Sequence, residues 1–114
     1  MNGNWENMNG NWTLTGDYLL DGKLAQNSEV FELNLTSVTP DHFTGTYVIP
    51  ADNDSQFDGH TYTSPRGTVI TIEQFDPLTS YFATYAACAK DGVLIGAWFD
   101  VDGKGGDFTL ERKA

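Results

Sequence analysis

The strongest constraint on the fold is the alternation of apolar and polar residues in short runs. Residues 12–18 place Trp12, Leu14 and Tyr18 on one face of an extended chain and threonines on the other. Side chains of a strand point alternately to its two faces, so this pattern predicts β-strands with one buried face. Comparable runs, rich in Val, Ile, Thr and aromatic residues, lie at 31–36, 43–49, 69–73, 81–89, 93–100 and 108–111.

Turn-forming residues separate these runs. Asp-Gly pairs at 21–22, 91–92 and 102–103 are typical of tight hairpins, because Gly accepts a positive φ at little cost. Turns of other kinds are expected at 40–41, 50–54, 64–67 and 76–77. The pair Asp58-Gly59 is either a further turn or a bulge inside one strand over residues 56–64, and we favour the bulge. Seven turns then leave eight strands.

These connections are too short for crossover helices, so consecutive strands are expected to pair antiparallel. We predict an all-β fold, an eight-stranded antiparallel up-and-down barrel that forms a single domain over residues 10–114. A β-sandwich is the alternative, because the same alternation suits both. Residues 81–90 contain alanines that would also suit a helix, but Thr84 and the neighbouring aromatic residues favour a strand.

The N-terminus repeats the motif Asn-Gly-Asn-Trp, once ending at Trp5 and once at Trp12. The second copy begins the first strand of the barrel. We predict that residues 1–9 form a flexible tail. The alternative is that Trp5 plugs one end of the barrel.

The charge balance narrows the range of partners. Among 114 residues, 16 are acidic and 6 are basic, which gives a formal net charge of −10. Such a chain repels phosphate groups, so neither nucleic acid nor a membrane surface is an expected partner. Homo-oligomerisation is left open. The N-terminus lacks the pattern of a signal peptide, so we expect a cytoplasmic protein or a mature secreted form.

No set of residues predicts an enzyme, a metal or a cofactor. His42 and His60 are the only histidines, and a metal site would need them to converge with Asp41 or Asp58. Surface histidines are the simpler interpretation. The single cysteine, Cys88, is expected to be a buried, inert thiol. The glycine-rich segment at 100–107 lacks the acid spacing of a calcium loop and predicts a tight hairpin.

Four aromatic residues suggest a site. Trp12, Tyr47, Tyr85 and Trp98 lie on separate predicted strands, so their rings converge in a barrel lumen, either as plain core or as the wall of a ligand site. Small residues beside Tyr85 would leave room for a ligand. We predict a non-enzymatic barrel that binds a small, partly apolar molecule in its lumen or mouth. The alternative is a protein- or glycan-interaction module, such as a small barrel inhibitor or a lectin.

In the predicted site, Asn53 or Asp107 gives the polar contact to the ligand.

Several short segments occur in a familiar order. They are Gly-Asn-Trp at 10–12, Phe-Thr-Gly-Thr-Tyr at 43–47, His-Thr-Tyr-Thr-Ser-Pro at 60–65, Gly-Thr-Val-Ile-Thr-Ile at 67–72, Leu-Ile-Gly-Ala-Trp at 94–98 and Asp-Phe-Thr at 107–109. Together they resemble the avidin/streptavidin family and, more loosely, the wider group of lipocalin-like (calycin) barrels. The resemblance covers most of residues 10–110 and implies an eight-stranded barrel.

The resemblance also implies roles for four residues. Tyr47 would hydrogen-bond the ureido oxygen of biotin, Asn53 would lie near the valeryl carboxylate, Trp98 would form a wall, and Asp107 would contact a ureido nitrogen. The chain departs from the family at Ile49, where a polar ureido-binding residue is usual. The strand at 70–75 lacks a terminal tryptophan, and the shorter last hairpin lacks the tryptophan lent to a neighbouring subunit. The resemblance therefore supports the fold more than biotin binding.

Overall fold

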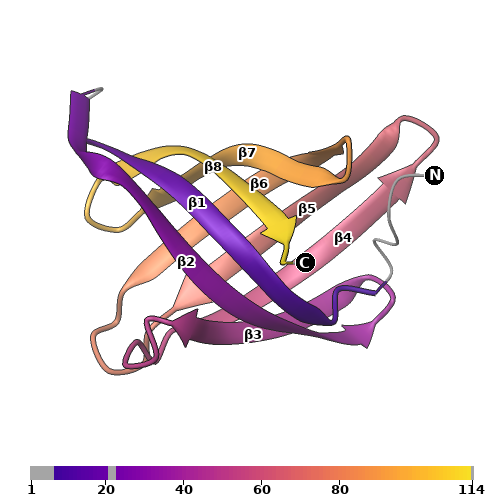
Figure 1. Cartoon of the computed structure of the whole chain (residues 1–114), viewed down its shortest axis with the longest axis horizontal. Helices are drawn as coiled ribbons and strands as arrows, with labels where there is room; N and C mark the ends of the chain where they lie inside the picture. Colours follow the sequence, from indigo (N-terminus) through magenta and orange to yellow (C-terminus); the bar gives the residue numbers. More distant parts are fainter. Residues whose placement is uncertain (1–6, 21–22, 114) are drawn as a thin grey trace.

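The computed structural model describes residues 7–20 and 23–113, which form a closed antiparallel barrel of eight strands (Figure 1). The strands are β1 (Gly10–Leu20), β2 (Lys23–Thr39), β3 (His42–Ile49), β4 (Gln56–Ser64), β5 (Gly67–Phe75), β6 (Phe82–Lys90), β7 (Val93–Asp100) and β8 (Lys104–Arg112). Each strand pairs with its sequence neighbour, and β8 pairs with β1 to close the barrel. The predicted up-and-down barrel is confirmed, and the sandwich is wrong.

Two predictions concern residues beyond those described, the plug by Trp5 and the Asp-Gly turn at 21–22. Across the described residues, no helix is long and apolar enough to cross a membrane.

The alternating runs place their apolar members in the lumen. The largest fully buried side chains are Trp12, Phe43, Met8, Leu33, Leu35, Ile70, Leu94 and Leu110. They come from six strands and from the segment before β1, so the barrel encloses one continuous core. Burial of apolar surface of this kind supplies most of the driving force for folding.

The connections gather at the two ends of the barrel. The loops β3–β4, β5–β6 and β7–β8 lie at one end, on the left in Figure 1, and the start of β1 and the end of β8 lie toward the other. The β6–β7 hairpin turns through Asp91 and Gly92, whose φ angles are 54° and 80°, as expected for an Asp-Gly turn. In the β7–β8 hairpin, one carboxylate oxygen of Asp100 accepts hydrogen bonds of 2.9 Å from the backbone N–H groups of Asp102 and Lys104. The prediction of a tight hairpin there is confirmed.

The Asp58-Gly59 pair forms neither a turn nor a bulge. It lies inside β4, which pairs with β3 and β5 in unbroken register. Gly59 is buried beneath the ring of Phe43, and a Cβ atom at Gly59 would lie 2.1 Å from Cζ of that ring. The predicted bulge is therefore wrong. Glycine is needed at this position because a larger side chain would collide with the ring of Phe43. The irregular registers occur instead where β2 pairs with β1 and β3.

Residues 7–9, which directly precede β1, are part of the domain. Met8 is 1% exposed, and its backbone N–H donates a hydrogen bond of 2.7 Å to Oγ of Ser37. The indole N–H of Trp12 donates to the Met8 carbonyl at 2.9 Å, and the Arg112 guanidinium lies 4.5 Å from the centre of the Trp12 ring. The tail predicted for residues 1–9 is therefore wrong at Met8, which closes this end of the lumen, and its residues 1–6 lie outside the described part of the chain.

Strand β6 confirms the strand predicted for residues 81–90, but it corrects the placement of the cysteine. Ala83, Tyr85 and Ala87 face the lumen and are buried, whereas Cys88 has the opposite parity and is exposed. The prediction of a buried thiol is wrong for this reason.

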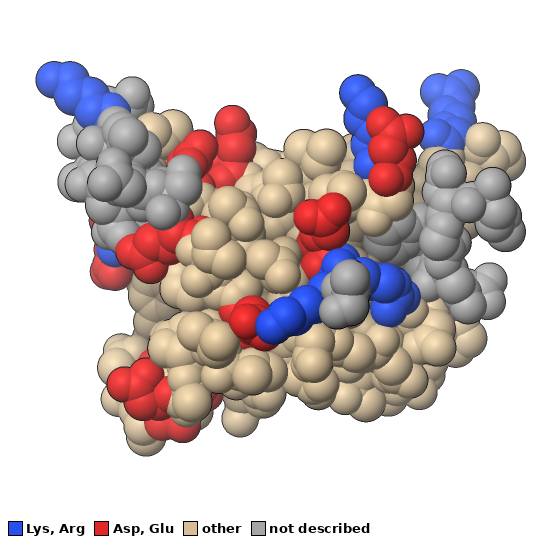
Figure 2. Space-filling view, viewed as in Figure 1, with Lys and Arg blue, Asp and Glu red and all other residues tan. Residues whose placement is uncertain are grey.

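Acidic side chains are spread over the face of the barrel shown in Figure 2, with broad uncharged areas between them.

Candidate ligand-binding site

Side chains fill the two halves of the lumen unequally. The half near Met8 is packed around Trp12, Phe43 and the buried leucines. The half near the β3–β4 and β5–β6 loops retains a cavity of about 400 Å³. A cavity of this volume is within the range of about 300–1,000 Å³ that is usual for small-molecule sites.

Aromatic rings form the walls of this cavity, and they pack in fixed pairs. Tyr85 stacks on Trp98 with ring centres 6.1 Å apart, and it meets the edge of Phe108 at 5.2 Å. Across the cavity, Tyr47 packs against Phe31 at 5.5 Å. Contacts between rings in such geometries are favourable and limit ring rotation. The walls are therefore already shaped before any ligand arrives.

Three hydroxyl groups and one carboxamide form a polar network inside the apolar lumen. Gln74 is 3% exposed, and its side-chain carbonyl accepts a hydrogen bond of 2.6 Å from the Tyr85 hydroxyl. Its amide nitrogen donates to the Tyr47 hydroxyl at 3.1 Å and to Oγ of Ser55 at 3.0 Å. All four residues line the cavity. A ligand therefore meets several preplaced donors and acceptors within one small area.

The Tyr47 hydroxyl stays protonated far above neutral pH. Burial raises the pKa of Tyr47 from 10.0 to about 12, the hydrogen bond from Gln74 acts in the opposite direction, and the charge of Glu29 raises it slightly further. Removal of a phenolate from water is costly, which explains the sign of the main effect. Tyr47 therefore presents a neutral hydroxyl to a ligand.

A second polar group lies where the cavity meets the β7–β8 hairpin. The Tyr81 hydroxyl donates a hydrogen bond of 2.7 Å to Oδ2 of Asp100, which is 8% exposed. The Lys104 ammonium lies 3.7 Å from the same oxygen. Nearby, the indole N–H of Trp98 donates to the backbone carbonyl of Asp17 at 3.0 Å. These contacts fix Tyr81 and Trp98, two of the side chains that line the cavity.

Four of the six predicted site residues meet at this cavity. Tyr47, Tyr85 and Trp98 contribute wall or network groups, and Asn53 lies at the rim in the β3–β4 loop. The side-chain oxygen of Asn53 accepts a hydrogen bond of 2.9 Å from the backbone N–H of Ser55, so this rim position is held in place.

The other two predicted residues lie elsewhere. Trp12 is completely buried in the packed half of the lumen, and it is a core residue rather than a wall of the cavity. Asp107 is exposed on the outer face of β8, opposite Ala97 of β7, because its neighbour Phe108 occupies the lumen. The predicted ligand contact through Asp107 is therefore wrong for this cavity.

Sequence reasoning missed the centre of the network. Gln74 follows Ile70 and Ile72 at the same parity along β5, so the alternation already indicates that it faces the lumen. A polar residue at an inward position needs a buried hydrogen-bonding partner. Ser55 precedes β4, and no pattern in the sequence marks it.

One expectation about the lumen is also corrected. Ala83 and Ala87 are buried but do not line the cavity, so the small residues of β6 are not what leaves it open. Both histidines of the chain, His42 and His60, lie outside the set of residues that line it.

Comparison of the chain with protein-family models, with curated proteins and with solved structures gave no match.

Proposed function

We propose that this chain is a non-enzymatic barrel that binds a small, partly apolar molecule in the cavity near the β3–β4 and β5–β6 loops. One observation carries the proposal, the hydrogen-bonded network around Gln74 that borders a cavity of about 400 Å³. A buried polar network in a lumen with vacant volume is an arrangement suited to orienting a ligand. Plain core packing would have filled this volume.

The lining indicates the chemistry of the ligand. Aromatic rings on opposite sides favour a compact ligand with a flat or apolar body. The carboxamide of Gln74 and the hydroxyls of Tyr47 and Ser55 can exchange hydrogen bonds with a group that both donates and accepts, such as an amide, a urea or a heterocyclic ring. A ligand of this class satisfies the polar wall and the apolar wall together.

Charge at the rim favours a ligand that is neutral or weakly cationic. Among the described residues that line the cavity, Glu29 and Asp76 are acidic and Lys104 is the one cation, which lies near the buried carboxylate of Asp100. The net charge of −10 adds to this negative field. An anionic ligand would be repelled by the acidic residues at the rim and by the net negative charge of the chain.

Tryptophan fluorescence with a library of neutral aromatic and heterocyclic amides and ureas tests the proposal. Biotin, which carries a carboxylate, is tested beside the library together with its neutral amide, because the resemblance to the avidin/streptavidin family implies it. The blocking variant is Gly16→Val, because Gly16 lines the cavity and has ordinary space around a Cβ atom, with Trp98 Nε1 3.6 Å away. The matched control is Thr15→Val, at the neighbouring position of β1, which lies outside the cavity lining.

The expected result is saturable binding of at least one compound, about 10-fold or more weaker in Gly16→Val and unchanged in Thr15→Val. A loss of affinity of this size corresponds to about 1.4 kcal/mol. Equal binding to both variants, or no binding by any member of the library, would overturn the proposal. The interaction-module alternative remains a prediction, and a glycan array run with the same variants separates it from ligand binding in the cavity.

A further inference from the structure

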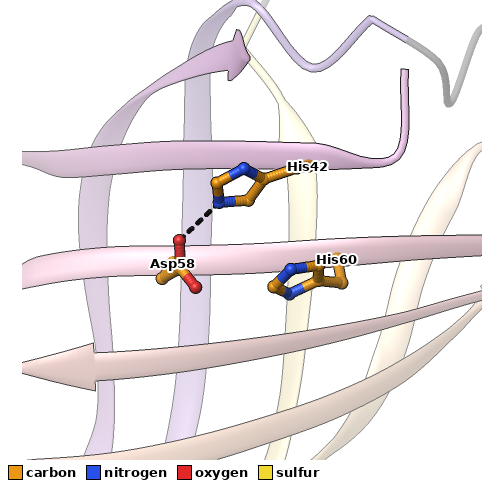
Figure 3. A group of neighbouring side chains, drawn as sticks. All are labelled: His42, Asp58 and His60. Atoms are coloured by element: carbon orange, nitrogen blue, oxygen red, sulfur yellow. Dashed lines mark hydrogen bonds and ion pairs between the residues drawn. The ribbon is translucent and has the colours of Figure 1, made fainter. Parts of the chain in front are cut away.

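The two histidines of the chain meet on the outer surface of the barrel. His42 of β3 and His60 of β4 are directly opposite each other in the antiparallel register. Their rings stack with centres 4.8 Å apart and planes 11° from parallel. Asp58 lies two residues before His60 on the same face of β4, and Figure 3 shows the three side chains grouped over the β3–β4 ladder.

The three side chains already approach one another closely. Nε2 of His42 lies 2.6 Å from Oδ1 of Asp58. One potential ligand atom from each of His42, Asp58 and His60 can be chosen so that all three lie within 4.8 Å of one another. In a tetrahedral zinc site with bonds of about 2.0–2.1 Å, neighbouring ligand atoms are about 3.4 Å apart. Small side-chain rotations therefore suffice to bring the three atoms around one ion.

We propose that His42, Asp58 and His60 form a binding site for zinc. Two imidazole nitrogens and one carboxylate oxygen are a ligand set that zinc accepts, with water in the remaining position. In the contact with Asp58, Nε2 of His42 donates its hydrogen to the carboxylate, and zinc takes the place of that hydrogen when it binds, while Nδ1 keeps the hydrogen of the ring. The site is independent of the lumen, because these side chains point away from it.

The strand scaffold supports the site. Directly opposed residues of antiparallel strands have Cβ atoms about 4.5–5.5 Å apart, a separation fixed by the backbone ladder rather than by side-chain choice. The side chains of His42 and Asp58 are 31% and 50% exposed, so an ion reaches them from solvent without opening the barrel. Glu73 of β5 lies opposite Asp58 and adds negative charge nearby.

An ion pair alone is a weaker explanation of the cluster. A single surface contact between His42 and Asp58 contributes little to stability, and it gives no role to His60. A bound cation uses all three side chains.

The site also lies on the shortest ladder among the described strands. β3 and β4 are paired over five positions, from His42–His60 to Thr46–Gln56, whereas the other pairs have six or more. Zinc bound to ligands on both strands would link them at one end of this ladder. We therefore expect binding to stabilise the folded protein.

Isothermal titration of the full chain with zinc alone tests the proposal. The titrations use a Cys88→Ser background as well as the native chain, because the exposed thiol of Cys88 is itself a zinc ligand. Excess magnesium suppresses unspecific binding to the acidic surface, since it competes for carboxylates and not for imidazoles. The variants are His42→Gln, His60→Gln and Asp58→Asn, with Asp54→Asn as the control for loss of one exposed acid.

The expected result is one saturable site in both backgrounds, weakened about 100-fold or more in either histidine variant and unchanged in Asp54→Asn. Removal of a residue that only hydrogen-bonds a metal ligand lowers the affinity for the metal about 10–100-fold. Removal of a ligand itself should therefore lower the affinity for zinc at least as much. When zinc exceeds its Kd about 100-fold, the melting temperature should rise by about 10 °C. Absence of saturable binding, or equal binding by His60→Gln, would overturn the proposal.

Proton NMR provides a second readout that does not depend on the variants folding. The chain has only two histidines, so in the native chain every imidazole C–H signal belongs to His42 or His60. Both rings should shift together as zinc is added. A shift confined to one ring, or to neither, contradicts a site that joins His42 to His60.

Discussion

The Tyr85 hydroxyl donates a hydrogen bond of 2.6 Å to the side-chain carbonyl of Gln74 inside the barrel. The two residues lie on neighbouring strands, β6 and β5, two positions out of direct register. Through its amide nitrogen, Gln74 also reaches Tyr47 of β3 and Ser55 of the β3–β4 loop. One carboxamide therefore joins three parts of the barrel wall that border the cavity.

Replacement of Gln74 by leucine tests the stability of this network. The variant Gln74→Leu keeps a similar volume but leaves the buried hydroxyls of Ser55 and Tyr85 and the partly buried hydroxyl of Tyr47 without their shared partner. We expect the free energy of unfolding to fall by about 1–3 kcal/mol, the usual cost of an unsatisfied buried polar group. Urea denaturation measures the change.

The matched control is Gln56→Leu, at an exposed position of β4. A substitution there should change the free energy of unfolding by less than about 0.5 kcal/mol. Equal effects of the two variants would mean that the Gln74 network contributes no specific stability.

The packing of Phe43 on Gly59 makes a second prediction. In Gly59→Ala, the new Cβ atom would lie 2.1 Å from Cζ of Phe43, so the ring has to move. Overpacking of this kind costs about 1–3 kcal/mol. Thermal unfolding of the variant should show a lower melting temperature.

A double-mutant cycle with Phe43→Leu identifies the cause. The smaller side chain leaves room for the Cβ atom, so the two substitutions together should cost at least about 0.5 kcal/mol less than the sum of their separate costs. Simple additivity would show that Gly59 is required for another reason, such as the backbone conformation of β4.

The fold was predictable from the sequence because its signals are local. Alternation fixes which residues of a strand face inward, and Asp-Gly pairs fix hairpins such as the one at Asp91 and Gly92. The same rule of parity places Phe108 in the lumen and Asp107 outside it. Gly59 shows where local rules fail, because its role depends on contact with a ring from another strand.

The candidate site was predictable only in part. The aromatic walls follow from strand parity, which identified Tyr47, Tyr85 and Trp98. The division of the lumen into a packed half around Trp12 and a vacant half depends on how all inward side chains fill the volume. The meeting of His42 with His60 depends on the register of β3 against β4, which turn length alone does not determine.

A third prediction concerns alkaline pH. The pKa of Tyr47 is about 12 in the folded protein and 10.0 in its unperturbed state. The unfolded chain therefore loses this proton first as the pH rises. The contribution of Tyr47 to stability is complete below pH 10 and is lost progressively as the pH approaches 12.

The variant Tyr47→Phe removes this titration. Denaturation at a series of alkaline pH values should show a shallower loss of stability between pH 10 and 12 in the variant than in the native chain. Tyr62 is 63% exposed, so Tyr62→Phe serves as the control and should follow the native curve. Coincident curves for all three proteins would contradict the burial of the Tyr47 hydroxyl.

The last prediction concerns the closed end of the barrel. Met8 is 1% exposed beside Trp12, so Met8→Ala should lower the free energy of unfolding by about 2–5 kcal/mol, the usual cost of removing a large buried aliphatic side chain. Leu78 is 77% exposed, and Leu78→Ala should have little effect. Chemical denaturation of both variants measures the difference. A small effect at Met8 would restore the view that the chain before β1 is a tail, whereas a large one makes Met8 part of the core that holds Trp12 in place.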